Sequence, residues 1–132
     1  MIDVDKMQNE VNNMEYQDAP ILDIQAAFLG DEISIYIEND KDTSYKVLFS
    51  ECLKVTYTTD VAIPNWRKGK VRDMSRSQLG YFAQEIELFE EEEKGFIRVE
   101  CNFHPMYMTI ICKEIELDKI KNSDINFFWG NK

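Results

Sequence analysis

Hydrophobic and polar side chains alternate with a period of two along most of this chain. The clearest case is the segment in which Ile33, Ile35 and Ile37 fall on one face while Ser34 and Glu38 fall on the other. Such alternation is typical of a β-strand that buries one face and exposes the other to water. The pattern therefore predicts a strand here, preceded by a tight Gly-Asp connection and followed by the polar run at 39–42.

Other segments share this character, and together they predict about seven strands. They cover residues 21–29, 33–38, 45–49, 53–57, 82–89, 97–103 and 106–117. The last is apolar on both faces at first, which favours a single central strand that is covered on both sides. The periodicity also predicts an interior set of side chains, namely Ile33, Ile35, Val47, Phe49, Val99 and Cys101.

The alternation changes phase around residues 50–52, between two of these segments. A bulge, or a bend into a second sheet, would turn the next apolar set inward. We therefore expect Leu53, Val55 and Tyr57 to point into the core.

The first 20 residues carry a weaker, helical pattern. Met7, Val11 and Met14 are spaced i, i+4, i+7, and Asp5 could cap the start of a short helix. Because no helix of useful length separates the strands, a βαβ fold is excluded. The expected fold is mainly β, an antiparallel sandwich or partly open barrel in one domain over residues 1–132.

Charge is distributed unevenly over the chain, whose net charge is -10. A long segment at 58–78 has no sustained period, and long loops of this kind tend to be functional or mobile. Within it, residues 66–76 carry a local charge of +4, which leaves -14 on the remainder. Such a surface repels nucleic acid and anionic membranes, so we expect neither as a partner, and it attracts basic partners.

The cysteines and the beginning of the sequence indicate a compartment. Cys52, Cys101 and Cys112 are odd in number and widely spaced, so they form no complete disulfide framework, and the first five residues are acidic where a signal peptide would be basic. We therefore expect a cytoplasmic protein in which Cys101 and Cys112 belong to the core.

Residues for catalysis are scarce. His104 is the only histidine, and the cysteines have no metal-ligand spacing. We therefore expect no enzyme activity, no catalytic residue, no metal and no cofactor.

Two features suggest a binding surface instead. Trp66 lies among the basic residues and could anchor an interface, because tryptophan is enriched at binding hot spots. The aromatic residues Phe127, Phe128 and Trp129 are expected mainly to pin the C-terminal segment onto the core. The second feature is an acidic cluster, suited to electrostatic docking of a partner, that consists of Glu85, Glu87, Glu90, Glu91, Glu92 and Glu93.

Three segments, at 28–35, 45–49 and 106–113, give the chain a resemblance to the small β-rich bacterial proteins of the YxiG type. That resemblance covers roughly residues 21–117. It implies an immunity protein of the polymorphic-toxin kind, encoded beside a large secreted toxin, which works by covering the toxin domain. It carries over no catalytic residues.

Two functions therefore stay open from the sequence. The first is a non-catalytic immunity module whose acidic surface covers a basic toxin domain, such as the C-terminal domain of a secreted toxin. The second is a β-barrel that holds a small ligand in a cavity lined by Tyr57, Phe82 and Phe103.

Overall fold

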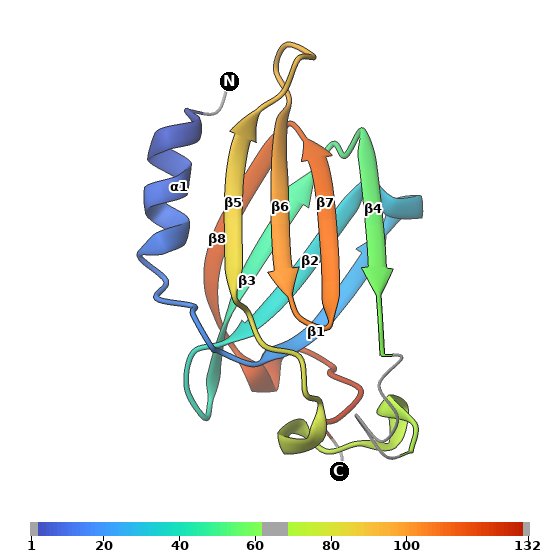
Figure 1. The fold of residues 1–132 in the computed structure, drawn as a ribbon. Helices are drawn as coiled ribbons and strands as arrows, with labels where there is room; N and C mark the ends of the chain where they lie inside the picture. The colour runs from blue at the N-terminus through green and yellow to red at the C-terminus, as the bar shows by residue number, and fades with distance from the viewer. Residues whose placement is uncertain (1–2, 62–68, 131–132) are drawn as a thin grey trace.

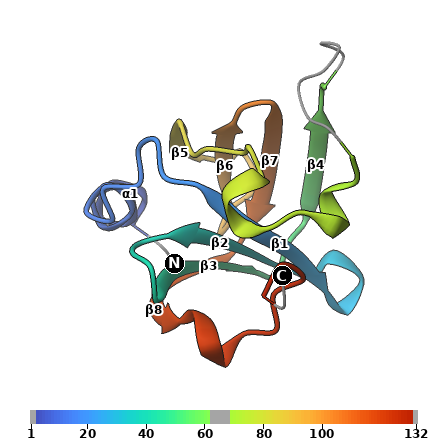
Figure 2. The ribbon, with the colours of Figure 1, turned by 90° about the horizontal axis from the view of Figure 1, so that it is seen from below.

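The computed structural model describes residues 3–61 and 69–130, and these form two four-stranded antiparallel sheets that face each other (Figures 1 and 2). The first sheet has the order β1-β2-β3-β8, with β1 (Ile21–Ala27), β2 (Glu32–Glu38), β3 (Thr43–Ser50) and β8 (Glu114–Lys121). The second has the order β4-β7-β6-β5, with β4 (Lys54–Thr59), β7 (Met106–Cys112), β6 (Ile97–Phe103) and β5 (Glu85–Glu90). The sandwich prediction is confirmed, and the sheets do not close into a barrel.

The core lies between the two sheets, and each strand supplies it with alternate residues. The six predicted interior residues are all buried: Ile33, Ile35, Val47, Phe49, Val99 and Cys101. Cys112 belongs to the same core and is free, as is Cys101. Burial raises the pKa of the Cys112 thiol to about 12, so it stays protonated and behaves as a small apolar group.

The segment 106–117 is two strands, which corrects the prediction of one central strand. β7 ends at Cys112 in the second sheet, and β8 begins at Glu114 in the first, so the chain changes sheets across Lys113. The Lys113 backbone N–H donates to the Ser50 carbonyl at 3.3 Å, next to the point where the chain crosses from β3 to β4. The sequence does not reveal this change of sheet, because β7 and β8 both bury a face in the same core.

The crossing after Ser50 confirms the expected change of sheet, but the side chains beyond it do not reach the core. Leu53 is 56% exposed and Tyr57 54% exposed, and Val55 also lies at the surface. β4 pairs with β7 and lies at the edge of its sheet, on the right in Figure 1. β4 is an edge strand at the open side of the sandwich, which periodicity does not reveal, so these side chains stay exposed although they point toward the first sheet.

Two other boundaries differ from the sequence prediction. The first strand ends at Ala27, and residues 28–30 form the short 3-10 helix η1 (Phe28–Gly30), in which Phe28 and Leu29 have positive φ angles. The strand expected from residue 82 begins at Glu85, and Phe82 forms only an isolated bridge with Pro20.

The N-terminal helix α1 (Val4–Asn12) lies beside β5, and its cap is Asp3 rather than Asp5 (Figure 1). The helix and the turn after it cover the free edge of that strand with side chains. Gln8 Oε1 accepts a hydrogen bond from the Leu88 N–H at 2.7 Å, and Tyr16 Oη accepts one from the Ile86 N–H at 2.8 Å. These polar side chains therefore take the place of a neighbouring strand.

Tyr16→Phe should lower the free energy of unfolding by about 1–3 kcal/mol, because the buried Ile86 N–H would lose its partner. Urea denaturation monitored by fluorescence measures this loss. The matched control is Tyr45→Phe, since the Tyr45 hydroxyl has no hydrogen bond to any of the described residues. Equal losses in the two variants would show that the edge contact contributes nothing specific.

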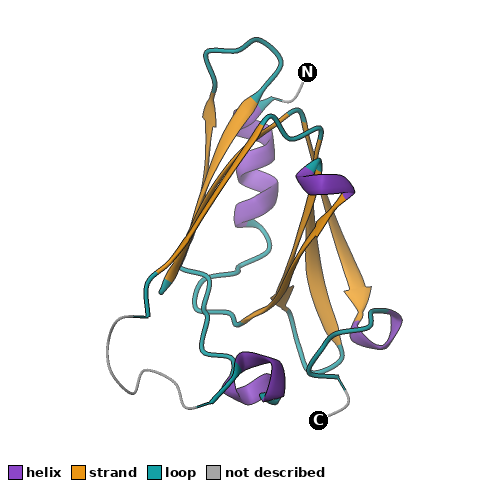
Figure 3. Cartoon of the chain, turned by 90° about the vertical axis from the view of Figure 1, so that its right-hand side faces the viewer, coloured by secondary structure: helices purple, strands orange, loops and turns teal. Residues whose placement is uncertain are grey.

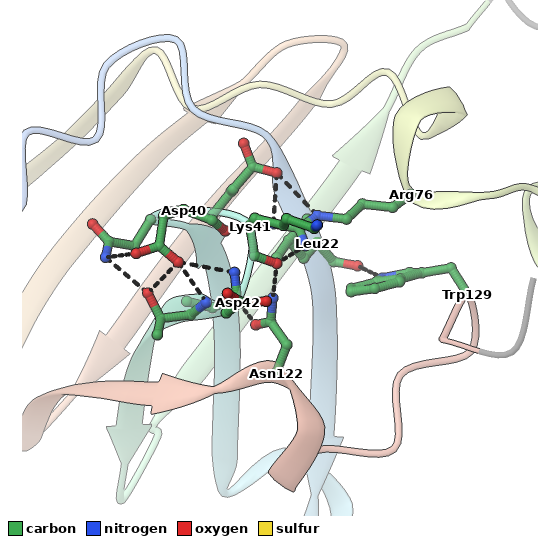
Figure 4. Close-up of polar contacts among 11 residues, drawn as sticks. Leu22, Asp40, Lys41, Asp42, Arg76, Asn122 and Trp129 are labelled. Atoms are coloured by element: carbon green, nitrogen blue, oxygen red, sulfur yellow. Dashed lines mark hydrogen bonds and ion pairs between the residues drawn. The ribbon is translucent and has the colours of Figure 1, made fainter.

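A smaller second core lies on the outer face of the first sheet, where the C-terminal segment folds back, as the sequence predicted for its aromatic residues. Phe127 and Trp129 are buried and stack with centroids 4.6 Å apart, whereas Phe128 is 39% exposed. Trp129 Nε1 donates to the Leu22 carbonyl at 2.8 Å (Figure 4). The other buried members of this core are Leu22, Tyr36, Met74 and Leu79.

Arg76 ties this second core to the β2–β3 turn. Its guanidinium lies 5.4 Å from the centroid of the Trp129 ring, pairs with Glu38 at 2.7 Å and donates to the carbonyls of Asp40 and Lys41 (Figure 4). The segment 71–79 that carries it includes the 3-10 helices η2 (Val71–Asp73) and η3 (Arg76–Gln78). This segment lies at the end where the two sheets diverge (Figure 3). Part of the expected basic loop is therefore structural.

Candidate functional site

The predicted acidic cluster divides into two parts. Glu85 and Glu87 alternate along β5 with the buried Ile86 and Leu88, so their side chains lie on the outer face of the second sheet. The other four glutamates lie at the end of β5 and in the turn toward β6: Glu90, Glu91, Glu92 and Glu93. The structure thus gives an acidic outer face and an acidic hairpin tip on the same pair of strands.

Glu100 belongs to the acidic outer face, although the sequence reasoning did not select it. It lies on β6 directly opposite Glu87 in the antiparallel register. Its side chain is 51% exposed. The signal was present in the sequence, because Glu100 occupies a polar position in the alternation of 97–103, but only the register shows which residue it faces.

The carboxylates of the outer face repel one another. The pKa of Glu87 is raised, first by a hydrogen bond shared with the Glu85 carboxyl, then by desolvation and by the negative charges of Glu85 and Glu100. Residues 85–100 contain seven glutamates against one lysine and one arginine. A cation placed over this face would relieve that repulsion.

Arg98 compensates one carboxylate in each part of the cluster. Its guanidinium lies 3.6 Å from carboxylate oxygens of both Glu91 and Glu100 and 4.7 Å from the centroid of the Phe89 ring. These contacts hold the hairpin tip against the sheet. No ion pair among the described residues neutralises Glu85 or Glu87.

A shallow cavity of about 330 Å³ lies between these glutamates and β7. Its lining includes Glu85, Glu87, Glu100 and Tyr107. Tyr107 is 44% exposed, and its hydroxyl lies 3.2 Å from His104 Nδ1, so the single histidine lies at the margin of this face. An exposed tyrosine beside unpaired carboxylates suits protein recognition, because aromatic residues are enriched at interface hot spots.

Trp66 lies outside the described residues, so its predicted role as an anchor stays a prediction.

The structure does not contain the predicted ligand cavity lined by Tyr57, Phe82 and Phe103 among the described residues. Phe103 is fully buried in the core, whereas Tyr57 and Phe82 are largely exposed, and a cavity of about 450 Å³ at the sheet edge is lined by Tyr57 alone of the three. The sequence prediction of a barrel interior lined by all three is wrong, because the sheets stay open at β1 and β4.

Residues 3–61 and 69–130 offer neither a metal-binding cluster nor a membrane-spanning helix. Within these ranges, no three histidine, cysteine or acidic side chains are arranged to hold a metal ion. No helix there is long and apolar enough to cross a membrane.

Comparison with known proteins identifies the family of the chain. No curated protein matches it. A similar solved structure is the crystal structure of an uncharacterized protein from Neisseria gonorrhoeae, with a TM-score of 0.54 and 13% sequence identity over 78% of this chain and 92% of that one. At this identity the likeness shows a shared fold only. Residues 3–119 match the immunity protein family PIM7, a span that includes both sheets almost entirely. The chain is a member of the PIM7 family of immunity proteins.

Proposed function

We propose that this immunity protein neutralises its toxin by covering a basic surface of the toxin domain with the acidic outer face of β5 and β6. The observation that supports the proposal is the pair Glu85 and Glu87, two carboxylates without an ion-pair partner among the described residues, facing Glu100 across the strands. Family membership implies a toxin as the partner. The basic character of that partner is our inference from charge complementarity.

Binding alone would be enough for the immunity protein to block the toxin. Lysine or arginine side chains of the toxin would lie over the carboxylates, and Tyr107 would be enclosed at the centre of the contact. A toxin that acts on nucleic acid needs a positive cleft to hold phosphates, so an acidic face that fills the cleft competes with its substrate. Neutralisation then requires occlusion only, and we propose that it takes place in the cytoplasm.

Co-expression with the toxin domain encoded beside this gene tests the proposal. We expect the two proteins to co-purify as a stoichiometric complex, and we expect cells that make both to survive. Tyr107→Ala with Glu87→Lys should abolish both results while the far-ultraviolet circular dichroism stays unchanged. If that double variant still co-purifies and protects cells, the interface lies elsewhere on the sandwich.

Binding should also depend on pH through Glu87. Because its pKa is raised, this carboxyl takes up a proton at a pH above the ordinary glutamate value of 4.5, and the protonated form attracts a basic partner less. Affinity should therefore be full above the raised pKa and fall as the pH drops through it. Titration calorimetry over this range measures the effect, and Glu87→Gln should flatten the dependence whereas Glu116→Gln on β8 should not.

Protein stability supplies the control for that experiment. A carboxyl whose pKa is higher in the folded than in the unfolded state makes the folded state bind more protons, so its contribution stabilises the free protein as the pH falls. Stability and affinity should therefore change in opposite directions through this group. A parallel loss of both would assign the weaker binding to unfolding.

A further inference from the structure

The free edges of the two sheets are not protected equally. The edge of β5 is covered by Gln8 and Tyr16, as described above. The exposed surface of β8 carries Glu116, Asp118 and Lys119, and charged side chains discourage pairing with another strand. On β1, Asp23 turns back to accept a hydrogen bond from the Ile24 N–H at 2.8 Å.

Within residues 3–61 and 69–130, none of these devices covers the edge of β4. All six residues of Lys54–Thr59 are exposed, and only the first of them is charged. Among the described residues, no strand lies beyond β4 in its sheet (Figure 1). An exposed edge rich in β-branched and aromatic residues is a template for another strand.

Apolar side chains gather along this edge. Leu53, Val55 and Tyr57 are exposed on the side that faces the first sheet. In η1, Phe28 is 75% exposed and Leu29 is fully exposed. η1 lies next to the start of β4, because the Cys52 N–H, just before β4, donates to the carbonyl of Asp31, just after η1, at 3.1 Å. Positive φ angles of 52° and 61° at Phe28 and Leu29 are costly for these side chains, yet they hold two large apolar groups in water.

The register of β4 determines which backbone groups face outward. Asp60 N–H donates to the Pro105 carbonyl at 3.1 Å, and the same register pairs Thr58 with Tyr107. Antiparallel ladders alternate, so the even-numbered residues bond to β7, and the backbone groups of Val55 and Thr59 point away from it. Any added strand must therefore pair with the odd-numbered residues.

We propose that a second copy of this chain occupies the edge, with the two β4 strands antiparallel about a two-fold axis at Tyr57. This register places Val55 opposite the partner's Thr59, so the outward-facing backbone groups meet in hydrogen-bonded pairs. It also places Lys54 opposite the partner's Asp60 on the outer face, once on each side of the axis. Tyr57 lies opposite the partner's Tyr57, and this cross-strand aromatic pair adds stability.

Self-complementarity is what selects a second copy as the occupant. Lys54 is the only charged residue of β4, and Asp60 follows the strand. The two residues are equally far from Tyr57, so the two-fold axis brings the basic end of each strand opposite the acidic end of the other. Two-fold dimers, whose interfaces are isologous, are the commonest homo-oligomers of soluble proteins. Both acidic outer faces would lie on the same side of the joined sheet and stay accessible, so the inference is independent of the toxin interface.

Sedimentation of the full chain over a range of concentrations tests the dimer. We expect a concentration-dependent species of twice the 15.6 kDa of one chain. Lys54→Glu should weaken the dimer about tenfold, because two favourable cross-strand pairs become repulsive. Lys54→Glu combined with Asp60→Lys should restore it, and Lys94→Glu, the same change at the β5–β6 turn, should have no effect.

Cross-linking tests the register directly. In a Cys52→Ser background, Tyr57→Cys should form an intermolecular disulfide, because residues at a two-fold axis face each other at about 5.5 Å between Cα atoms. Lys54→Cys should not, since two copies of that residue would lie six positions apart along the strands. A protein that stays monomeric at its solubility limit overturns the proposal. Protection of the β4 backbone amides from hydrogen exchange that arises only when the toxin is added also overturns it. If Lys54→Glu with Asp60→Lys fails to restore the dimer, the proposed register is wrong.

Discussion

Replacing Glu85 and Glu87 with lysine should slow association with the toxin domain by tenfold or more. The two substitutions change the charge of the acidic outer face by four units, and electrostatic steering between opposite charges raises association rates by roughly 10- to 1,000-fold. Dissociation should change less than association, because electrostatic steering acts mainly on the rate of encounter. Stopped-flow or surface plasmon resonance measurements separate the two rates.

The matched control reverses two acidic residues on the other sheet. Glu116→Lys with Asp118→Lys makes the same change in net charge on exposed residues of β8. This control should leave the association rate within about twofold, because charges more than a Debye length of ~8–10 Å away are screened. Raising the salt concentration should slow the original protein strongly and the Glu85 and Glu87 variant weakly. Equal effects of the two double variants would mean that net charge, rather than this face, sets the rate.

Reversal of the hairpin tip separates the two parts of the acidic cluster. Glu92→Lys with Glu93→Lys alters exposed turn residues that have no ion pair among the described residues. If the tip contributes to steering, the rate falls by a smaller factor than for Glu85 and Glu87, because the tip lies at the end of the β5–β6 hairpin (Figure 1). A larger fall for the tip would move the centre of the interface to the turn.

Trp129→Ala should cause a large loss of stability, about 3–5 kcal/mol in the free energy of unfolding. The substitution removes a buried ring that stacks on Phe127, an indole N–H that donates to Leu22, and the surface on which Arg76 rests. Denaturant unfolding measures the loss, and the melting temperature should fall by more than about 8 °C.

Phe128→Ala is the control for that variant. Phe128 is adjacent in sequence but 39% exposed, so its truncation should cost less than about 1 kcal/mol. Similar losses of unfolding free energy at the two positions would show that packing in the second core contributes little to stability. Toxin binding by the folded fraction of Trp129→Ala should be unchanged, because the second core lies on the opposite sheet from the acidic outer face.

The strands and the core could be predicted because burial of one face imposes a period of two. Val47 and Phe49 show this: each alternates with a less buried residue and each is almost completely buried. The same rule fails at Val55 and Tyr57, since the pattern of an edge strand is indistinguishable from that of a strand with a facing sheet. Periodicity reports which side a residue faces and not whether anything lies there.

The acidic part of the candidate site could be predicted from charge alone, but its arrangement could not. Glu85 and Glu87 are neighbours by alternation, whereas Glu100 joins them only through the β5–β6 register. Tyr107 lies on the next strand and shows no sequence signal beyond an outward position. The sequence places Arg76 in a basic loop, but its structural role depends on contacts with Glu38 and Trp129, which are far from it in sequence.

The pairing of β8 with β3 has a consequence for the time course of protection. Ser50 pairs with Glu114 and Thr43 with Lys121, so this ladder joins residues more than sixty positions apart, and closing so long a loop precedes any gain from the contact. Folds dominated by such contacts typically form in milliseconds to seconds. The acidic outer face, by contrast, comes from consecutive strands within residues 85–112. Its two hairpins need only local contacts, whereas the first sheet is complete only once β8 has paired with β3, so we expect a newly made chain to reach full protective capacity only after that pairing.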